Sequence, residues 1–291
     1  MASTESFSQR FASIEDWQTQ DLVDGIIEGQ FAAMAAVHGA RDALTRAIDA
    51  ISERLAGGGR LIYAGAGTSG RIAAQDAAEL PPTFNWPYER AISLMAGGEG
   101  ALLRAAEGAE DRRDLAENAL KEIGAGPKDV VIALAASGRT PFAIAALDYA
   151  RSVGALAVGI YNNKGGKLGD AADIPVLLET GTEFVSGSTR MKAGTAQKAA
   201  LNCISTGVMI KLGFVYRGKM VEMHPSNVKL VERARLMVEE LTGAAPEAAA
   251  RAMEEGGSIK MATVMLMKSV SAAEARALLD AAGGNLRRAL A

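Results

Sequence analysis

Residues 61–84 read LIYAGAGTSGRIAAQDAAELPPTF, and they predict a strand, a tight glycine turn and a helix in direct succession. The apolar run at residues 61–63 is long enough for a buried strand, and the glycine-rich turn GAGTSG at residues 65–70 follows at once. The alanine-rich segment at residues 71–79 then favours a helix. We expect that helix to stop at Pro81-Pro82, because proline lacks the N–H group that a helix interior needs.

The turn at residues 65–70 predicts a cradle for phosphate. Backbone N–H groups point outward at a helix start, where the helix dipole also favours an anion. Thr68, Ser69 and Gly70 lie at this start, and the two hydroxyl groups add donors. The three glycines also fit the G-x-G-x-x-G pattern of dinucleotide-binding proteins. However, the next apolar run, residues 91–95, ends in Ala-Gly-Gly instead of an acidic residue, and no lysine is placed as in a Walker A loop. A smaller phosphorylated ligand is the favoured interpretation, with a nucleotide or a plain tight turn as alternatives.

The α/β pattern continues beyond this stretch. Strand-like runs occupy residues 91–95, 130–134, 156–161 and 174–178, and helix-like segments occupy residues 100–107, 112–122 and 141–152. Alternation of this kind predicts a parallel sheet with helices on both faces, in which ligands bind beyond the carboxyl ends of the strands. A second polar turn, AASGRT at residues 135–140, places Ser137, Gly138 and Thr140 at such an end.

A third polar segment, EFVSGSTRMKAGTAQK at residues 183–198, precedes a helix that continues to about residue 212. Ser188 and Thr189 could cap this helix, and Arg190 and Lys192 would place two cations at an already positive terminus. We therefore expect a third wall of the anion site. The plainer alternative is helix capping beside a solvated basic turn.

The chain divides by pattern into three regions. Residues 1–57 form an N-terminal helical region whose first 15 or so residues look loosely structured, and residues 58–215 form the α/β domain. Strand signals vanish from Val228 onward, so residues 216–291 are expected to be a small helical C-terminal region, entirely helical beyond about residue 240.

Composition excludes several classes of protein. The net charge of −3 and the aromatic content of 5% over 291 residues give no reason to expect a nucleic acid or an acidic membrane as partner. The polar start lacks the apolar core of a signal peptide, and no apolar run approaches the roughly 18 residues of a membrane span, so we expect a cytoplasmic protein.

Cys203 is the only cysteine, which excludes an intrachain disulfide, and its apolar surroundings predict a packed core thiol. His38 and His224 are too isolated to suggest a metal site.

Five motifs carry a resemblance to a known family: AGAGTSGR (64–71), AAELPPTF (77–84), AGGEGALLRAAEGAED (96–111), ALAASGRTPF (133–142) and SGSTRMKAGTAQKAALNCISTGVMIKLG (186–213). Together they closely resemble the N-acetylmuramic acid 6-phosphate etherases, which are sugar-isomerase-type (SIS) domain proteins of bacterial cell-wall recycling. The resemblance covers roughly residues 58–233 and continues more weakly through the C-terminus. Two segments depart from the family pattern, TESFSQRFASIEDWQT (4–19) and the loop YNNKGG (161–166).

The resemblance implies a lyase that cleaves the lactyl ether at C3 of N-acetylmuramic acid 6-phosphate, giving N-acetylglucosamine 6-phosphate and D-lactate without a cofactor or a metal. It places the two functional glutamates of the family at Glu79 and Glu110. In the ring-opened aldehyde the C2 proton is acidic, so we assign Glu110 as the base that removes it. Glu79 would then protonate the departing lactate oxygen and activate the water that adds at C3. An acid of this kind must stay neutral near pH 7, which burial or a like charge can ensure.

Three alternatives remain open from the residues alone. Any single glutamate is most often a solvated surface charge, and spacing does not show that Glu79 meets the acidic cluster at Glu107 and Glu110. Related SIS proteins sense sugar phosphates without turnover, and others isomerise aldoses and ketoses. The family resemblance also implies a homodimer as the working assembly.

Overall fold

The computed structural model of the protein describes residues 3–223 and 228–291, so His224 lies outside the described residues. The chain forms two compact units. Residues 1–78 and 88–205 make up the first unit, and residues 79–87 and 206–291 make up the second. Within the described residues no helix is long and apolar enough to cross a membrane.

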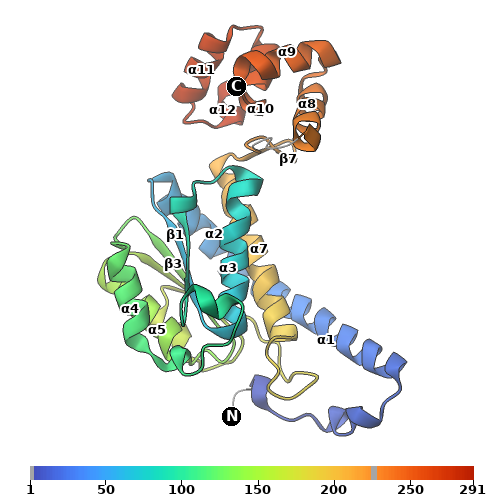
Figure 1. Ribbon diagram of the computed structural model, residues 1–291, viewed down its shortest axis with the longest axis vertical. Helices are drawn as coiled ribbons and strands as arrows, with labels where there is room; N and C mark the ends of the chain where they lie inside the picture. The colour runs from blue at the N-terminus through green and yellow to red at the C-terminus, as the bar shows by residue number, and fades with distance from the viewer. Residues whose placement is uncertain (1–2, 224–227) are drawn as a thin grey trace. The chain divides into compact units, whose positions relative to one another are not determined.

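The first unit is built on a five-stranded parallel sheet with the strand order β2-β1-β3-β4-β5 (Figure 1). Every residue of β1, β3 and β4 is buried, whereas the edge strand β2 is half-exposed. Parallel strands that are covered on both faces read as continuous apolar runs, which is why the sequence pattern located them. The strands are β1 (Leu61–Gly65), β2 (Ala91–Met95), β3 (Val130–Ala135), β4 (Leu156–Tyr161) and β5 (Ile174–Leu177). The predicted parallel sheet flanked by helices is therefore confirmed.

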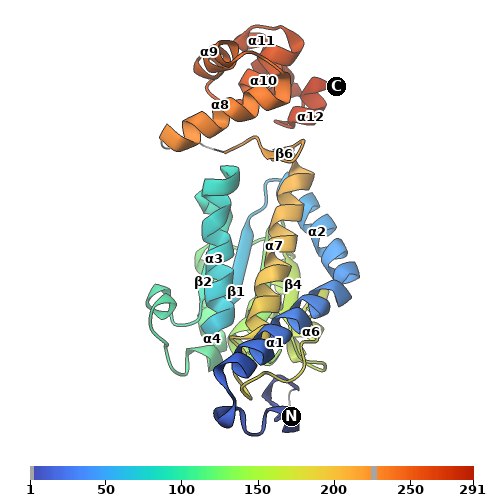
Figure 2. The same ribbon diagram turned by 90° about the vertical axis from the view of Figure 1, so that its right-hand side faces the viewer.

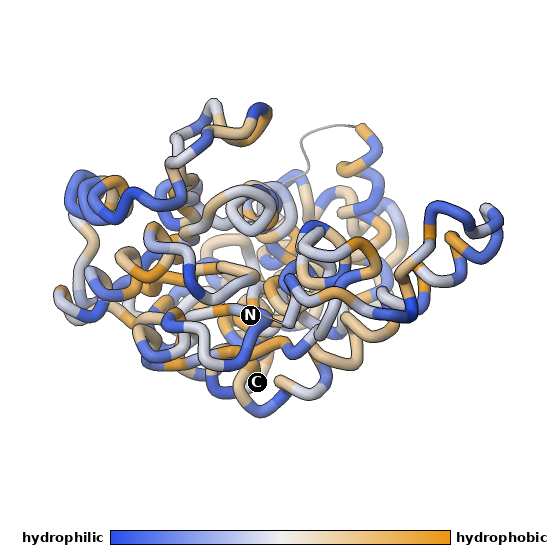
Figure 3. Tube along the Cα trace, turned by 90° about the horizontal axis from the view of Figure 1, so that it is seen from below, coloured by the Kyte–Doolittle hydropathy of each residue, from blue (hydrophilic) through white to orange (hydrophobic). Residues whose placement is uncertain are grey.

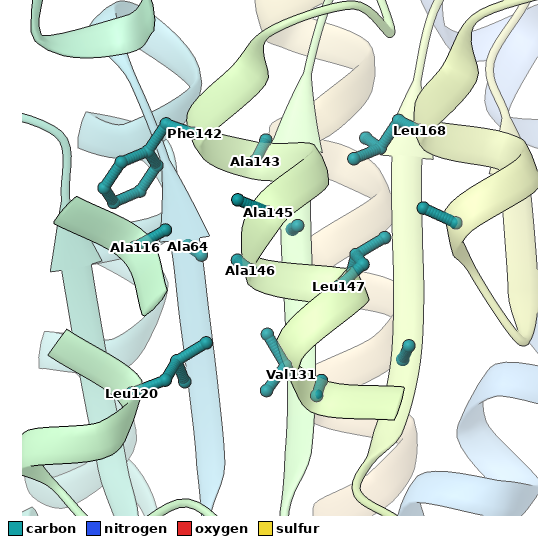
Figure 4. Close-up of a cluster of buried hydrophobic side chains, with 14 of the residues drawn as sticks. Ala64, Ala116, Leu120, Val131, Phe142, Ala143, Ala145, Ala146, Leu147 and Leu168 are labelled. Atoms are coloured by element: carbon teal, nitrogen blue, oxygen red, sulfur yellow. The ribbon is translucent and has the colours of Figure 1, made fainter. Parts of the chain in front are cut away.

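Helices cover both faces of this sheet (Figure 2). One face is covered by α4 (Arg113–Glu122), α5 (Pro141–Ser152) and α6 (Lys167–Ala171), and the other by α2 (Arg41–Ala56) with the first-unit parts of α3 (Gly67–Phe84) and α7 (Lys192–Leu212). Helix α5 presents Ala143 and Ala146 to the sheet beside Val131, while Phe142 and Leu147 fill the spaces on either side (Figure 4). The small side chains bring the helix close to the strands, as dense interior packing requires.

A buried hydrogen-bond network ties the sheet to the second helical layer. The hydroxyl of Tyr63 on β1 donates to Asp76 on α3 at 2.7 Å, and Ser205 on α7 donates to the same carboxylate at 3.1 Å. Burial, followed by the charge of Asp76, raises the pKa of Tyr63 well above its ordinary value. The tyrosine therefore remains a neutral hydrogen-bond donor inside the core.

The N-terminal segment is more ordered than its sequence suggested. Three short 3-10 turns, η1 (Ser3–Glu5), η2 (Gln9–Phe11) and η3 (Ile14–Asp16), precede α1 (Thr19–Gly39). Thr4 is fully buried, and its N–H donates to the side-chain oxygen of Asn163 at 3.1 Å. Asn163 in turn donates to the Thr4 hydroxyl at 2.8 Å. The expectation of a loose start was wrong because its anchor lies about 160 residues away, in the loop after β4.

The second unit is mainly helical. A two-stranded antiparallel hairpin, β6 (Val215–Tyr216) and β7 (Lys219–Met220), precedes its helices. Seven consecutive residues of α10, Ile259–Met265, are buried, so this helix forms the centre of the unit. Hydrophobic and hydrophilic residues are interspersed along the trace of the chain (Figure 3). The helices of the unit are α8 (Val228–Thr242), α9 (Pro246–Gly256), α10 (Ile259–Lys268), α11 (Ala272–Ala281) and α12 (Leu286–Leu290). Beyond about residue 240 every element is a helix, as predicted, but the hairpin of β6 and β7 lies at the start of the region that was expected to be helical from residue 216.

Two predicted helix limits were wrong. Helix α3 continues through Pro81 and Pro82 to Phe84, where Asn85 adopts a φ of 52° and donates its N–H to the Pro81 carbonyl at 2.8 Å. Because Pro81 and Pro82 have no N–H group, they cannot donate to the carbonyl groups four residues earlier, and the helix ends two residues after them. The helix expected at residues 100–107 is only the short η5 (Glu99–Leu102), followed by η6 (Ala109–Asp111). Gly97, Gly98 and Gly108 all have positive φ around these turns, which breaks any continuous helix.

The interpretation of Cys203 as a core thiol was also wrong, because the cysteine is exposed. Helix α7 buries Leu201, Ile204 and Val208, and Cys203 falls outside this stripe. When a helix carries small residues on both its buried and its exposed face, the sequence pattern does not indicate which face a given residue occupies.

Candidate functional site

A cavity of about 410 Å³ lies at the carboxyl ends of β1 and β3. The chain leaves β1 toward β2 on one side of the sheet, and β3 lies on the other side, so this is the topological switch point of the sheet. Ligands of open parallel sheets bind at such points. The cavity is lined by five of the six hydroxyl residues predicted for the anion site: Thr68, Ser69, Ser137, Thr140 and Thr189.

The start of α3 opens onto this cavity. A Cβ atom on Gly70 would lie 2.7 Å from the carbonyl oxygen of Gly65 and 2.3 Å from the sulfur of Met95, so only glycine lets the helix start so close to β1. The N–H of Gly70 donates to the Ala66 carbonyl at 3.0 Å, which closes the first helical turn. No side chain within residues 3–223 or 228–291 accepts from the N–H groups of Thr68 and Ser69. These two donors are available to an anion.

The start of α5 is similarly open. Thr140 occupies the N-cap position without a side-chain capping bond, and Pro141 follows at the first helical position. The Ser137 hydroxyl accepts the N–H of Arg139 at 3.1 Å, and Gly138 turns the chain with a φ of 67°. Gly138 and Gly70 thus shape the turns without lining the cavity themselves.

The start of α7 is different. Capping by Ser188 and Thr189 was the plainer alternative for this segment, but the cap is Glu183, whose side chain accepts the N–H of Lys192 at 3.1 Å and of Ala193 at 2.9 Å. Glu183 is only 1% exposed, and this burial raises its pKa although the two N–H bonds oppose the shift. A buried carboxylate therefore already occupies the anion position of α7. Of the predicted third wall, Thr189 lines the cavity, whereas Ser188, Arg190 and Lys192 do not.

Ser69 is connected to the interior by a chain of hydrogen bonds. Its hydroxyl donates to Gln197 at 2.8 Å, and Gln197 donates to Asn162 at 3.0 Å. Asn162 in turn donates to the Leu178 carbonyl at 3.1 Å. Because the hydroxyl proton of Ser69 is used inside the core, its side chain positions the helix start, and its backbone N–H remains as the donor toward the cavity.

The two predicted catalytic glutamates lie in different places. Glu110 lines the cavity from η6, next to Asp111. Glu79 lies ten residues after Ser69 in α3, so at 1.5 Å per residue it is about 15 Å along the helix. Glu79 is exposed and does not line the cavity. A single chain therefore brings Glu110, but not Glu79, to the open helix starts.

Three charged residues that line the cavity were missed in the sequence. Arg139 is an exposed cation in the turn before α5, where its place directly ahead of a helix start could have marked it. Glu5 and Asp111 also line the cavity. Glu5 follows the buried Thr4, which is held by Asn163, so the two segments that depart from the family pattern contact each other at the rim of the site. No cluster of three or more His, Cys, Asp or Glu side chains in the described residues is arranged to hold a metal ion.

The fold and the cavity define a SIS-domain protein. The family model "Glucokinase regulatory protein N-terminal SIS domain" matches residues 6–151, and the model "SIS domain" matches residues 121–206. Among solved structures, a phosphoheptose isomerase from Francisella tularensis is similar over 67% of this chain and 98% of its own, with a TM-score of 0.50 and 18% identity. A putative phosphosugar isomerase involved in capsule formation from Bacteroides fragilis is similar over 70% and 98%, with a TM-score of 0.52 and 19% identity. At these identities the likeness shows the fold alone.

Closer relatives identify the family within this class. The N-acetylmuramic acid 6-phosphate etherase of Deinococcus radiodurans is 47% identical over 288 residues, covering 99% of this chain and 94% of the relative. The etherase of Lactobacillus gasseri is 44% identical over 289 residues, covering 99% and 97%. The chain belongs to the N-acetylmuramic acid 6-phosphate etherase family, as its motifs predicted.

Proposed function

We propose that this protein is a carbon–oxygen lyase that converts N-acetylmuramic acid 6-phosphate to N-acetylglucosamine 6-phosphate and D-lactate. The observation that carries the proposal is the cavity at the switch point, in which Glu110 lies beside two helix starts without side-chain caps. Relatives along nearly the whole chain are named for this activity.

The starts of α3 and α5 suit the 6-phosphate group. The N–H groups of Thr68 and Ser69 and the hydroxyl groups of Ser137 and Thr140 would donate to its oxygens, and Arg139 would add a cation at the mouth. Holding the phosphate fixes C6 of the opened sugar, so the carbons nearer the aldehyde reach Glu110 across the cavity. This positioning supplies much of the rate enhancement in reactions of bound substrates.

Glu110 is proposed as the general base. In the ring-opened sugar the aldehyde acidifies the proton on C2, and the Glu110 carboxylate takes it. The electron pair forms the C2–C3 double bond as the bond between C3 and the lactyl oxygen breaks, and the departing oxygen takes a proton. Water then adds its hydroxyl group to C3 while C2 regains a proton, which completes the balance.

Glu79 is proposed as the acid that serves the lactyl oxygen, within a homodimer. Glu79 lies about 15 Å along α3 from the phosphate end of the helix. The few bonds between C6 and C3 of the sugar cannot span that distance. A second copy would bring Glu79 to the neighbouring cavity and cover its exposed side chain, and burial favours the neutral form that an acid requires. The resemblance also supports a location in the cytoplasm.

The test is incubation with N-acetylmuramic acid 6-phosphate and an assay for D-lactate. Glu110→Gln should lose about 100- to 10,000-fold in turnover and also abolish exchange of the C2 proton with deuterated solvent. Glu79→Gln should lose most lactate release yet keep some exchange, because the two protons belong to different atoms. Glu117→Gln, at a half-exposed position of α4 outside the cavity, is the matched control and should behave as the wild type.

Other outcomes would redirect the assignment. Exchange that survives in the Glu110 variant but vanishes in the Glu79 variant would reverse the two roles. Near-normal lactate release by both variants would remove the two-carboxylate mechanism. Absence of D-lactate together with interconversion of an aldose and a ketose phosphate would identify an isomerase, and binding without turnover would identify a sensor.

A further inference from the structure

A second, smaller cavity of about 210 Å³ adjoins the phosphate cavity. The two cavities share Ala66, Gly67 and Glu110 as lining residues. Whole-ligand sites in proteins usually measure about 300–1,000 Å³, so this volume suits a substituent of the substrate and not a second sugar phosphate. The remaining lining residues are Arg71, Met95, Ala96, Ala101, Ala105, Ala106, Glu107 and Gly108.

Most of this lining is suited to a methyl group. Ala96 and Ala101 are buried, each 3% exposed, and two further alanines and Met95 line the same cavity. Methyl groups and a thioether make favourable dispersion contacts with an apolar group and need no hydrogen-bond partner. A small apolar group is therefore favoured against this part of the wall.

Arg71 gives the cavity hydrogen-bond donors. Its Nε donates to the Leu102 carbonyl and one Nη2 proton donates to the Ala101 carbonyl, both at 2.9 Å. A guanidinium group has five N–H donors, so three remain, and they find no acceptor in the part of the chain that the structure describes. The residue is held rigidly by the loop while it keeps capacity to bind an acceptor.

Glu107 and Glu110 place carboxylate acceptors on the same cavity. A group that complements the whole lining has a methyl group, a hydrogen-bond acceptor for Arg71 and a hydrogen-bond donor for a carboxylate. The acetamido group has all three and carries no charge. The lactyl carboxylate would pair with Arg71 but would also face two like charges, which is unfavourable in a partly desolvated site.

We infer that this cavity binds the acetamido group on C2 of the substrate, with Arg71 donating to its carbonyl oxygen and Glu107 accepting its N–H. The inference rests on the proposed function, in which Glu110 removes the proton from the same carbon. Glu110 lines both cavities, so C2 lies at their junction when C6 points to the helix starts. The acetamido group then fixes the rotation of C2 and aims its proton at the base.

The first experiment varies the acyl group in the wild-type protein. D-Lactate release is measured with the N-acetyl, N-formyl and N-propanoyl forms of the 6-phosphate substrate, and with a glycolyl ether that lacks the lactyl methyl group. A missing methyl group in an apolar pocket lowers kcat/KM by about 10- to 200-fold, which we expect for the N-formyl form. The glycolyl ether should change kcat/KM less.

The second experiment changes the cavity. Ala101→Val should fill it, so that the variant prefers the N-formyl over the N-acetyl substrate. Arg71→Met should lower kcat/KM for the N-acetyl substrate by about 10- to 100-fold, which corresponds to the usual free energy of a charged hydrogen bond. For an analogue with a hydroxyl group in place of the acetamido group on C2, kcat/KM should fall much less. Arg104→Met removes an exposed cation from the same loop, and Arg104 itself lines neither cavity. This variant should change neither the preference between the N-formyl and N-acetyl substrates nor the ratio of kcat/KM for the N-acetyl substrate to that for the C2-hydroxyl analogue.

Several results would overturn the inference. An equal loss on all substrates in the Arg71 variant would mean that this residue only anchors the loop. A strong response to the glycolyl ether with none to the acyl series would assign the cavity to the C3 substituent. D-Lactate released at equal rates from all three acyl forms would overturn the inference alone, whereas no D-lactate from the N-acetyl compound would also remove the proposed function.

Discussion

Helices α3 and α7 both begin after a turn rich in glycine, serine and threonine, yet their first N–H groups have different partners. At α3, the N–H groups of Thr68 and Ser69 meet no side-chain acceptor among the described residues and face the cavity. At α7, the N–H groups of Lys192 and Ala193 are bound by the buried carboxylate of Glu183. One helix start is left for a ligand, and the other is already neutralised by the protein.

The difference teaches that a positive helix terminus is not by itself a ligand site. Each helix start favours an anion to a similar extent through its dipole and its unpaired donors. The two helices differ in the origin of the anion. For α7 it is the side chain of Glu183, which lies nine residues before Lys192 in the chain. Removing or adding such an internal carboxylate should therefore convert one kind of helix start into the other.

The largest effect is expected when α3 is made to resemble α7. Thr68→Asp places a carboxylate at the open helix start, where it competes for the N–H groups and repels the phosphate dianion. Juxtaposed like charges cost several kcal/mol, so kcat/KM should fall by about 100- to 1,000-fold. Thr68→Asn, which has the same size without the charge, is the control. Equal KM values for both variants would show that the phosphate binds elsewhere.

An intermediate effect is expected at Ser69. Ser69→Ala leaves the buried oxygen of Gln197 without its donor, which should lower the free energy of unfolding by about 1–3 kcal/mol. KM should change little, because the backbone N–H remains. Ser137→Ala is the matched control for stability alone, since its half-buried hydroxyl accepts only the local N–H of Arg139; its KM should rise, because this hydroxyl is proposed to bind the phosphate. A large rise in KM for the Ser69 variant at unchanged stability would instead place the Ser69 hydroxyl on the phosphate.

The smallest effect is expected at the α7 cap. Glu183→Gln keeps one acceptor oxygen, but its amide N–H₂ group faces a backbone N–H donor. The free energy of unfolding should therefore fall by about 0.5–2 kcal/mol, the range measured for lost helix caps. Activity should fall only through this loss of stability. Denaturant titrations of the variant and the wild type measure the difference.

The same variant should alter the pH dependence of stability. Burial raises the pKa of Glu183 above its ordinary 4.5, so the folded protein holds this proton more tightly than the unfolded chain does. That contribution to stability is fully present below pH 4.5 and is lost as the pH rises through the raised pKa. Glu183→Gln should remove this decline, whereas Glu179→Gln, an exposed residue of the same segment, should keep it. An identical pH profile in wild type and Glu183→Gln would contradict the assignment.

The fold was largely predictable because its signals are local. Buried parallel strands such as β1, β3 and β4 are continuous apolar runs, and the polar turns at residues 65–70 and 135–140 follow two of them directly. The wrong predictions involve distant partners or backbone conformation. Thr4 is ordered by Asn163, and the region after β2 is broken by three positive-φ glycines despite its alanine-rich sequence.

The sequence by itself determined the class of sheet, the two polar turns at strand ends and the family motifs that contain Glu79 and Glu110. These features depend on residue type and short spacing, which a linear pattern contains. Only the tertiary structure decided that Glu183 caps α7, that Arg71 borders a second cavity and that Glu79 lies about 15 Å along α3 from the open helix start. Each of these depends on which side chains become buried together, and burial is set by the packing of segments that lie far apart in the chain.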